Sequence, residues 1–249
     1  MSPEHVTSLE SPNIISLLAH QFAGTSCEHF LHSWENVIFS FIAMVILGIF
    51  SYWGSRKISV IPGRLQSFIE LLVESVSHLF GEMLGNQAKT FVPLVGTLFL
   101  YILSMNLLGL IPLMKSSTSS LSTTAALAIC AFSCFLYTAI KEEGLLGFLY
   151  HMAGKPKDAL VLTIFMWVFI FPIEVITVFI RPITLSLRLQ GNISSEDLVL
   201  SIIAHFGFIG ALILPFMTLL ALLAAVIQAF VFSFLTTIYL ASIVNEEEH

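Results

Sequence analysis

The sequence predicts an all-α integral membrane protein, and three observations lead to that prediction. Of the 249 residues, 57% are hydrophobic and 10% are charged, whereas soluble domains average about 25% charged residues. The mean hydropathy is +0.93. Several apolar runs also reach the roughly 20 residues that a helix needs to cross a bilayer. The few charges are scattered, so the net charge of -6 gives no indication of a nucleic-acid partner.

The first part of the chain predicts an N-terminal transmembrane helix. Residues 1–35 form a polar segment without Lys or Arg, and residues 36–53 form an apolar run that ends at Trp53. Tryptophan is enriched at membrane–water interfaces, and basic residues gather on the cytoplasmic side of membrane spans. Because Arg56 and Arg64 follow the run and no basic residue precedes it, we expect the N-terminus to lie outside.

The next three segments show three different patterns. Residues 62–86 alternate apolar and polar side chains at helical spacing, which predicts an amphipathic helix on a bundle or at an interface. Residues 91–140 contain two apolar runs joined by a short polar loop, and they predict a helical hairpin. Residues 141–158 carry lysines again, so they predict a cytoplasmic loop with a short re-entrant or interfacial segment.

The last part of the chain predicts two long membrane helices, over residues 159–205 and 211–244. If the first is helical throughout, it reaches about 70 Å at 1.5 Å per residue. The hydrocarbon core of a bilayer is only about 30 Å thick. The helix must therefore lie steeply oblique to the membrane or break.

The same pair of helices predicts which residues face each other. A turn centred near residue 208 places Arg188 opposite Gln228, because the two are equally far from the turn along the chain. The same count places Asp197 opposite residues 219–221.

Charged residues in the apolar C-terminal part are the candidates for function. An arginine at bilayer depth costs between about 3 and more than 10 kcal/mol, so it either pairs with another group or performs a task. Glu174, Arg181 and Arg188 are spaced seven residues apart, which places them on one face of a helix. Asn192 shares the face of Arg188, whereas Asp197 points the other way and lies about 13 Å further along.

This arrangement suits the passage of protons by two unconnected half-paths. Glu174 lies about 21 Å from Arg188 in one direction, and Asp197 lies about 13 Å away in the other. Carboxylates can relay protons, while a permanent cation between them prevents a continuous proton wire.

The segment RPITLSLRLQGN, from Arg181 to Asn192, resembles the core motif of subunit a of the rotary F-type ATP synthases. The segments PGRLQSFIE, NLLGLIP and QAFVFSFLTTIYL extend the resemblance over nearly the whole chain. The resemblance implies an ion-translocating stator subunit with two proton half-channels against a ring of c subunits. It also implies that Arg188 is the essential arginine between the half-channels.

The resemblance implies further proton-translocation residues. They include polar and titratable side chains on both sides of the arginine: Glu174, Asn192, Glu196, Asp197, His205 and Gln228. The chain departs from the family pattern at Gln190, at the Ser194-Ser195-Glu196 run and at Ala221. Ala221 stands where many members carry a titratable residue, so Glu196 and His205 are both candidates for the outer relay.

The resemblance implies partners but no cofactor and no metal. The partners are the c-subunit ring, a peripheral-stalk subunit b, the other ATP synthase subunits and membrane lipid. The chain has no catalytic site of its own, because ATP chemistry belongs to other subunits. We expect it in the plasma (inner) membrane of a bacterium, with its C-terminus in the cytoplasm.

Alternative interpretations stay open at this level. Arg188 could bind the anionic substrate of a secondary transporter, which would predict internal repeats that the sequence does not show. It could also pair helices in a structural membrane subunit. Arg181 and Glu174 could serve only each other, Tyr239 could be an interface residue, and Asn106 with the Ser/Thr cluster at 119–124 could serve helix packing.

Overall fold

The computed structural model describes residues 15, 26–56, 63–111, 113–152 and 166–244. Within these ranges the regular structure is entirely helical, as predicted for an all-α protein. The main helices are α2 (Ser26–Ser55), α3 (Arg64–Leu84), α4 (Ala88–Gly109), α5 (Leu121–Met152), α7 (Phe171–Ala204) and α8 (Gly207–Val244), with short turns η3 (Gly85–Gln87), η4 (Ser117–Ser119) and the π-helical η5 (Met166–Ile170).

Five helices of the described chain are long and apolar enough to cross a membrane. They lie at Trp34–Gly54, Ala88–Gly109, Leu121–Lys141, Trp167–Ala204 and Gly207–Ile243. The helix α3 is amphipathic instead: Val76, Phe80 and Leu84 are buried, whereas Glu74 and His78 are exposed. The buried Phe80 ring contacts Phe99 of α4 and Phe230 of α8, with centroid distances of 6.1 Å in both cases.

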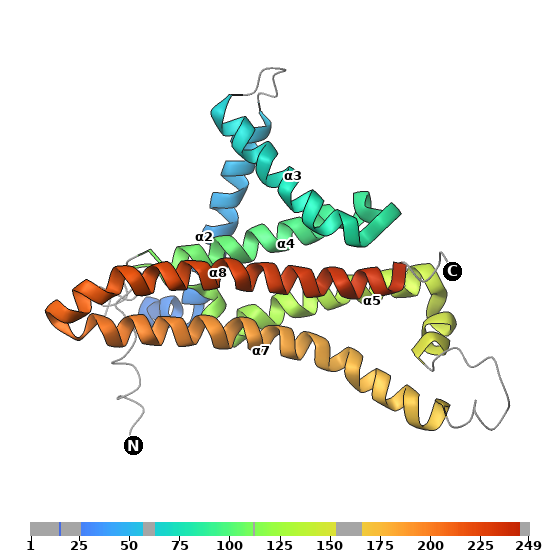
Figure 1. Ribbon diagram of the computed structural model, residues 1–249. Coiled ribbons are helices and arrows are strands. Elements are labelled where there is room, and N and C mark those ends of the chain that lie inside the picture. The colour runs from blue at the N-terminus through green and yellow to red at the C-terminus, as the bar shows by residue number, and fades with distance from the viewer. Residues whose placement is uncertain (1–14, 16–25, 57–62, 112, 153–165, 245–249) are drawn as a thin grey trace.

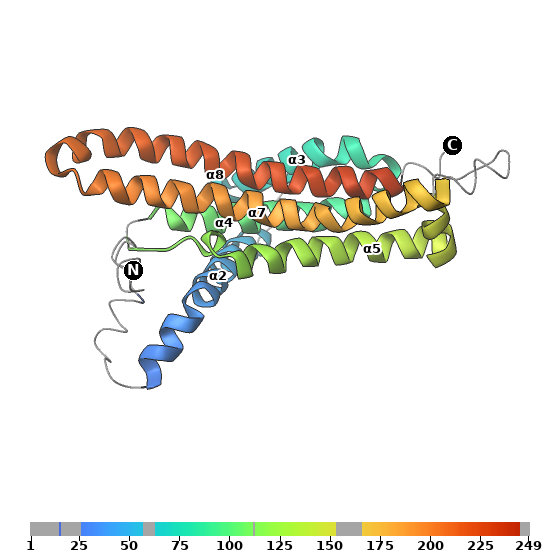
Figure 2. The ribbon, with the colours of Figure 1, turned by 90° about the horizontal axis from the view of Figure 1, so that it is seen from below.

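The two C-terminal helices form a long antiparallel pair, around which the others are arranged (Figures 1 and 2). The helix α5 packs along α7, and α4 packs along α8. With 34 and 38 residues, α7 and α8 extend over about 51 and 57 Å. Because a hydrocarbon core is about 30 Å thick, the pair must be strongly tilted. In Figure 1, α2 stands steeply across the direction of this pair.

The turn between α7 and α8 depends on two glycines. Helix α7 ends at Ala204 and α8 begins at Gly207, whose φ of +60° lies in the left-handed region that favours glycine. One turn later, a Cβ on Gly210 would collide with the carbonyl oxygen of Ile203. The reversal thus lies close to the position near residue 208 expected from the sequence. We call this the turn end of the pair, and the opposite end the open end.

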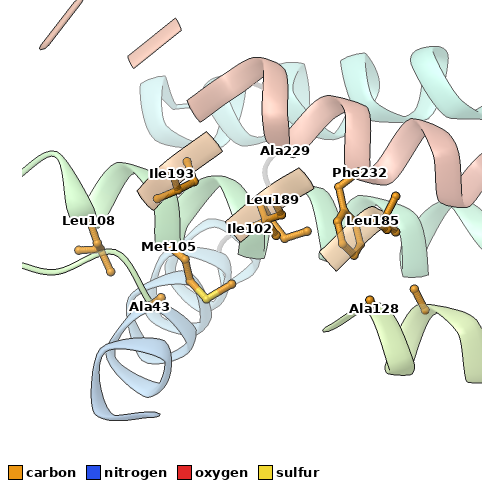
Figure 3. Close-up of a cluster of buried hydrophobic side chains, with 11 residues drawn as sticks. Ala43, Ile102, Met105, Leu108, Ala128, Leu185, Leu189, Ile193, Ala229 and Phe232 are labelled. Carbon is orange, nitrogen blue, oxygen red and sulfur yellow. The ribbon is translucent and has the colours of Figure 1, made fainter. Parts of the chain in front are cut away.

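Buried side chains hold one face of α7 against its neighbours. Leu185, Leu189 and Ile193 recur at four-residue spacing on that face, and all three are buried. Figure 3 shows them among side chains from four other helices, namely Ala43 of α2, Ile102, Met105 and Leu108 of α4, Ala128 of α5, and Ala229 and Phe232 of α8. The opposite face of α7 is consequently left exposed.

The structure differs from the sequence prediction after Lys141. A cytoplasmic loop with a short re-entrant or interfacial segment was expected over residues 141–158, whereas α5 continues as helix to Met152. The helix breaks at Gly144, which has φ 72° and ψ 164°, and the segment after it buries Met152. Burial of that apolar side chain favours a second short helical piece over an open loop. Residues 153–158 lie outside the described residues, as does the beginning of the long helix expected from residue 159.

Candidate functional site

Arg188 lies near the middle of α7, on the face turned away from the rest of the chain. Its side chain is exposed, and so are those of Asn192 and Ser195 on the following turns. Apolar neighbours on the same side of the helix are also exposed, such as Ile183 at 56% and Leu187 at 50%. Within the described part of the chain, the Arg188 guanidinium has no ion pair or hydrogen bond.

Asn192 and Gln228 join the two long helices by a side-chain hydrogen bond. The Nδ2 atom of Asn192 donates to Oε1 of Gln228 over 2.8 Å, and Gln228 is only 4% exposed. Counting residues from the turn had placed Gln228 opposite Arg188, which lies one helical turn before Asn192 on α7. Helical side chains tilt toward the N-terminus of their own helix, so in an antiparallel pair the two tips shift in opposite directions. That shift brings Gln228 to Asn192.

At the open end, Glu174 and Arg181 are brought together as their seven-residue spacing predicts. The Nη2 atom of Arg181 lies 3.5 Å from Oε1 of Glu174. The same guanidinium lies over the ring of Tyr239 on α8, with Cζ 4.7 Å from the ring centroid. The charge of Arg181 is therefore met by an acid on its own helix and by an aromatic face on the next.

Between Arg188 and the turn end, α7 carries two adjacent acids, Glu196 and Asp197. Both side chains are half-buried. Counting five residues toward the turn from the Asn192–Gln228 contact places Asp197 near the level of Leu223, within one turn of the range expected from sequence. Ala221, which stands where a titratable partner was sought, is buried at 5% exposure.

His205 lies at the turn end and contacts its own helix. Its Nδ1 atom lies 2.8 Å from the carbonyl oxygen of Ser201. A carbonyl only accepts, so Nδ1 carries the proton of this bond. This contact satisfies one of the final carbonyls of α7. The structure thus gives His205 a role in ending the helix, and Glu196 lies nine residues, about 13 Å, away along the axis.

A network of buried and half-buried polar groups joins four elements of the chain. From the sequence, helix packing was the role expected of Asn106 and of the Ser/Thr cluster at 119–124. Thr118 of η4 donates to Oδ1 of Asn106 over 2.6 Å, and Asn106 Nδ2 donates to the carbonyl oxygen of Ala225 on α8 over 3.2 Å. Ser194 of α7 donates to the carbonyl oxygen of Ser119 over 3.0 Å. We call Asn106, Thr118, Ser119 and Ser194 the polar seam.

The seam continues to α5 through Thr124, whose hydroxyl lies 3.1 Å from that of Ser186 on α7. The signal in the sequence was a Ser/Thr-rich loop and one asparagine inside an apolar span, but nothing in the pattern indicated that they meet. They meet because α4 packs on α8 and α5 packs on α7, with η4 between them.

Comparison with known proteins identifies the family. The sequence model of the family described as ATP synthase A chain matches residues 37–241. The chain is 42% identical over 251 residues to ATP synthase subunit a of Protochlamydia amoebophila (strain UWE25), covering 96% of this chain and 90% of that protein. It is 36% identical to subunit a of Moorella thermoacetica (85% and 91% covered) and 35% identical to that of Trichlorobacter lovleyi (92% and 97% covered).

The chain belongs to the ATP synthase A chain family. The resemblance drawn from the motifs is thereby confirmed, and the transporter alternative is not favoured. The family match spans α2 to α8 and includes all seven candidate site residues. Five membrane-length apolar helices in a member of this family make the chain a multi-pass integral membrane protein. As a subunit, it works within a complex of other chains.

Proposed function

We propose that this chain is the ion-translocating stator subunit of a rotary ATP synthase. It provides two proton half-channels against a ring of c subunits, with Arg188 between them. The observation that carries the proposal is the position of Arg188: exposed, near the middle of a membrane-length helix, and beside exposed apolar side chains such as Leu187.

An arginine in that position needs a partner from outside the chain. A guanidinium keeps its proton in proteins and is costly to place in lipid. A ring that presents one carboxylate at a time supplies the missing charge. Two opposite charges 4 Å apart attract by about 1 kcal/mol in water and by severalfold more at lower effective dielectric. Arg188 therefore stabilises the ring carboxylate in its charged form as it passes.

The outer half-path runs from the turn end toward Arg188. Glu196 and Asp197 supply the titratable groups, and the Asn192–Gln228 pair lies between them and the arginine. The polar seam borders the same stretch, since Ser194 lies two residues before Glu196 and bonds to Ser119. Buried hydroxyl and amide groups of this kind can hold water in a bilayer, where lipid cannot satisfy them.

The inner half-path leads from Arg188 to the open end, where Glu174 is its acid. Glu174 is 39% exposed by side chain and lies about 21 Å from Arg188 along α7. The two paths are kept apart because Arg188, a permanent cation, lies between them on this face of α7. A proton thus crosses the membrane while it is bound to the ring carboxylate, which the turning ring moves from one path to the other.

The proposal also includes the orientation of the chain, the membrane that holds it and its partners. The turn end of α7–α8 faces outward and the open end faces the cytoplasm, in the plasma (inner) membrane of a bacterium. The arginines after α2 support this orientation by the positive-inside rule. The partners are the c-subunit ring on the Arg188 face and a peripheral-stalk subunit b elsewhere on the chain.

The test is ATP-driven proton pumping in inverted membrane vesicles that carry Arg188→Ala. We expect pumping to be abolished while the ring still co-purifies with the chain. Ser133→Ala is the matched control, because Ser133 is exposed on α5 and bonds only the Ile129 carbonyl of its own helix; we expect it to pump normally. Normal pumping by Arg188→Ala in an assembled complex would contradict the proposal.

A further inference from the structure

Three side chains at the open end form a continuous line of contacts across two helices. Glu174 and Arg181 belong to α7, and Tyr239 belongs to α8. The guanidinium lies 3.5 Å from the carboxylate and 4.7 Å from the ring centroid. The second distance is well inside the roughly 6 Å over which a cation is attracted to an aromatic face.

The ion pair alone is a weak restraint. The side chain of Glu174 is 39% exposed and that of Arg181 is 24% exposed, and their separation is at the outer limit of a hydrogen bond. Partly exposed pairs of long side chains contribute little, since they must be ordered to meet. The beginning of α7 is also irregular, because Pro172 and the π-helical turn η5 lie directly before Glu174.

The ring of Tyr239 provides the restraint on Arg181 that its ion pair with Glu174 does not. A planar guanidinium can stack on a ring while its edge stays free to donate hydrogen bonds. Here the ring belongs to α8, whose neighbouring residues Leu240 and Ala241 are buried in a core cluster. The packing of α8 therefore holds Tyr239 in place, and the contact of its ring with Arg181 restrains the guanidinium.

A small cavity adjoins the same guanidinium. It has a volume of about 20 Å³ and is lined by Arg181, Thr236 and Tyr239 together with apolar residues of α5. A cavity of this size can hold one water molecule. A water there can accept from one guanidinium N–H that Glu174 does not use.

We propose that Tyr239 is a positioning residue of the inner half-path: its ring holds Arg181, and Arg181 in turn holds Glu174 at the open end. This inference rests on the proposed function, because it assigns Glu174 to that path. Tyr239 acts through its ring face and through Arg181; its hydroxyl group is not required.

The experiment is a double-mutant cycle on the initial rate of ATP-driven proton pumping in inverted vesicles. The variants are Tyr239→Leu, Arg181→Met and the two combined. We expect Tyr239→Leu to slow pumping by about threefold to tenfold, as loss of one cation–π contact implies. The combined variant should pump as Arg181→Met alone, because the ring has no effect once the cation is absent. Tyr239→Phe keeps the ring face and should stay within about twofold of the parent.

Two results would overturn the positioning role. One is a combined variant whose loss is the product of the single losses, since the two residues would then act independently. The other is a Tyr239→Phe variant as slow as Tyr239→Leu. If Tyr239→Leu does not co-purify with the complex, Tyr239→Met takes its place; failure of both while Arg181→Met assembles would show that Tyr239 acts in folding alone.

Arg188→Ala in the same vesicles separates this inference from the proposed function. Pumping that survives Arg188→Ala would overturn the proposed function whatever the cycle shows. Pumping that is lost in Arg188→Ala, together with independent effects in the cycle, would overturn only the role of Tyr239.

Discussion

Arg181 and Arg188 are the same residue type on the same helix, seven positions apart, in opposite situations. Arg181 is held by an acid and an aromatic ring. Arg188 is exposed and has no ion pair or hydrogen bond among the described residues. The first arrangement fixes a charge within the chain, whereas the second presents a charge to another chain. This contrast supports the proposal that Arg188 is the arginine that meets the ring carboxylate.

The stability of the protein should depend on the hydrogen bond from Asn192 to the buried amide of Gln228. We expect Asn192→Leu to destabilise the protein by about 1–3 kcal/mol, because it leaves the Gln228 oxygen buried without its bond. Gln228→Leu should cost less, since the amide left behind at Asn192 is exposed. Thermal unfolding of the purified complex in detergent measures both. Equal losses for the two variants would show that the bond is not the source of the effect.

Thr118 should contribute to stability through the polar seam. Its side chain is fully buried and donates to Asn106 over 2.6 Å. Thr118→Val keeps the shape but removes the donor, so we expect a loss of about 1–3 kcal/mol. Thr97→Val is the control, because Thr97 is exposed and bonds only its own helix. The comparison is made by thermal unfolding, and similar values for both would argue against the seam.

Residue contacts could be predicted from the sequence only where one helix contains both partners. Spacing alone places Arg181 beside Glu174. The contact of Arg181 with Tyr239, and that of Asn192 with Gln228, depend on how two helices are set side by side and on which way the side chains tilt. Neither the relative placement of two helices nor the direction of a side chain can be predicted from a residue pattern.

At the scale of elements, hydropathy indicated the helices but not their packing partners. The end of α7, the length of α8 and the turn near Gly207 agree with the sequence prediction, whereas α7 begins at Phe171 and the start expected at residue 159 lies outside the described residues. That α4 packs on α8 and α5 packs on α7 did not follow from it. Helices in lipid are apolar on all sides, so no amphipathic face marks the surface that meets a neighbour. The continuation of α5 past Lys141 was missed for a related reason, because lysines near a helix end are compatible with helix or loop.

The α7–α8 turn should be sensitive to a single methyl group. Gly210→Ala places a Cβ against the Ile203 carbonyl oxygen, so the first turn of α8 must move away from α7. We expect a loss of at least 1–2 kcal/mol, roughly the cost of overpacking a tight contact. Gly48→Ala in α2 is the matched control, because nothing lies within 4 Å of the added atom. A Gly210→Ala protein that unfolds at the same temperature as the control would contradict this close approach.

At the scale of the whole molecule, the chain is one half of an interface. The polar seam and the buried Gln228 lie between helices, while one face of α7 exposes Arg188 together with apolar Leu187 and polar Asn192. A surface of that kind is not stable against lipid alone. Its family membership makes it a subunit of a complex, and this face of α7 is the surface that we propose meets the ring.

That face can be mapped by cross-linking. In a background with the three native cysteines replaced by alanine, we expect Leu187→Cys and Ser195→Cys on the exposed side of α7 to form disulfides with cysteines placed beside the ring carboxylate. Leu189→Cys should form none, because Leu189 is fully buried against α4 and α8. The products are read by gel mobility after mild oxidation. Cross-links from Leu189→Cys, with none from Leu187→Cys or Ser195→Cys, would contradict this assignment. The ring would then lie on another surface, and Arg188 would not be in the ion path.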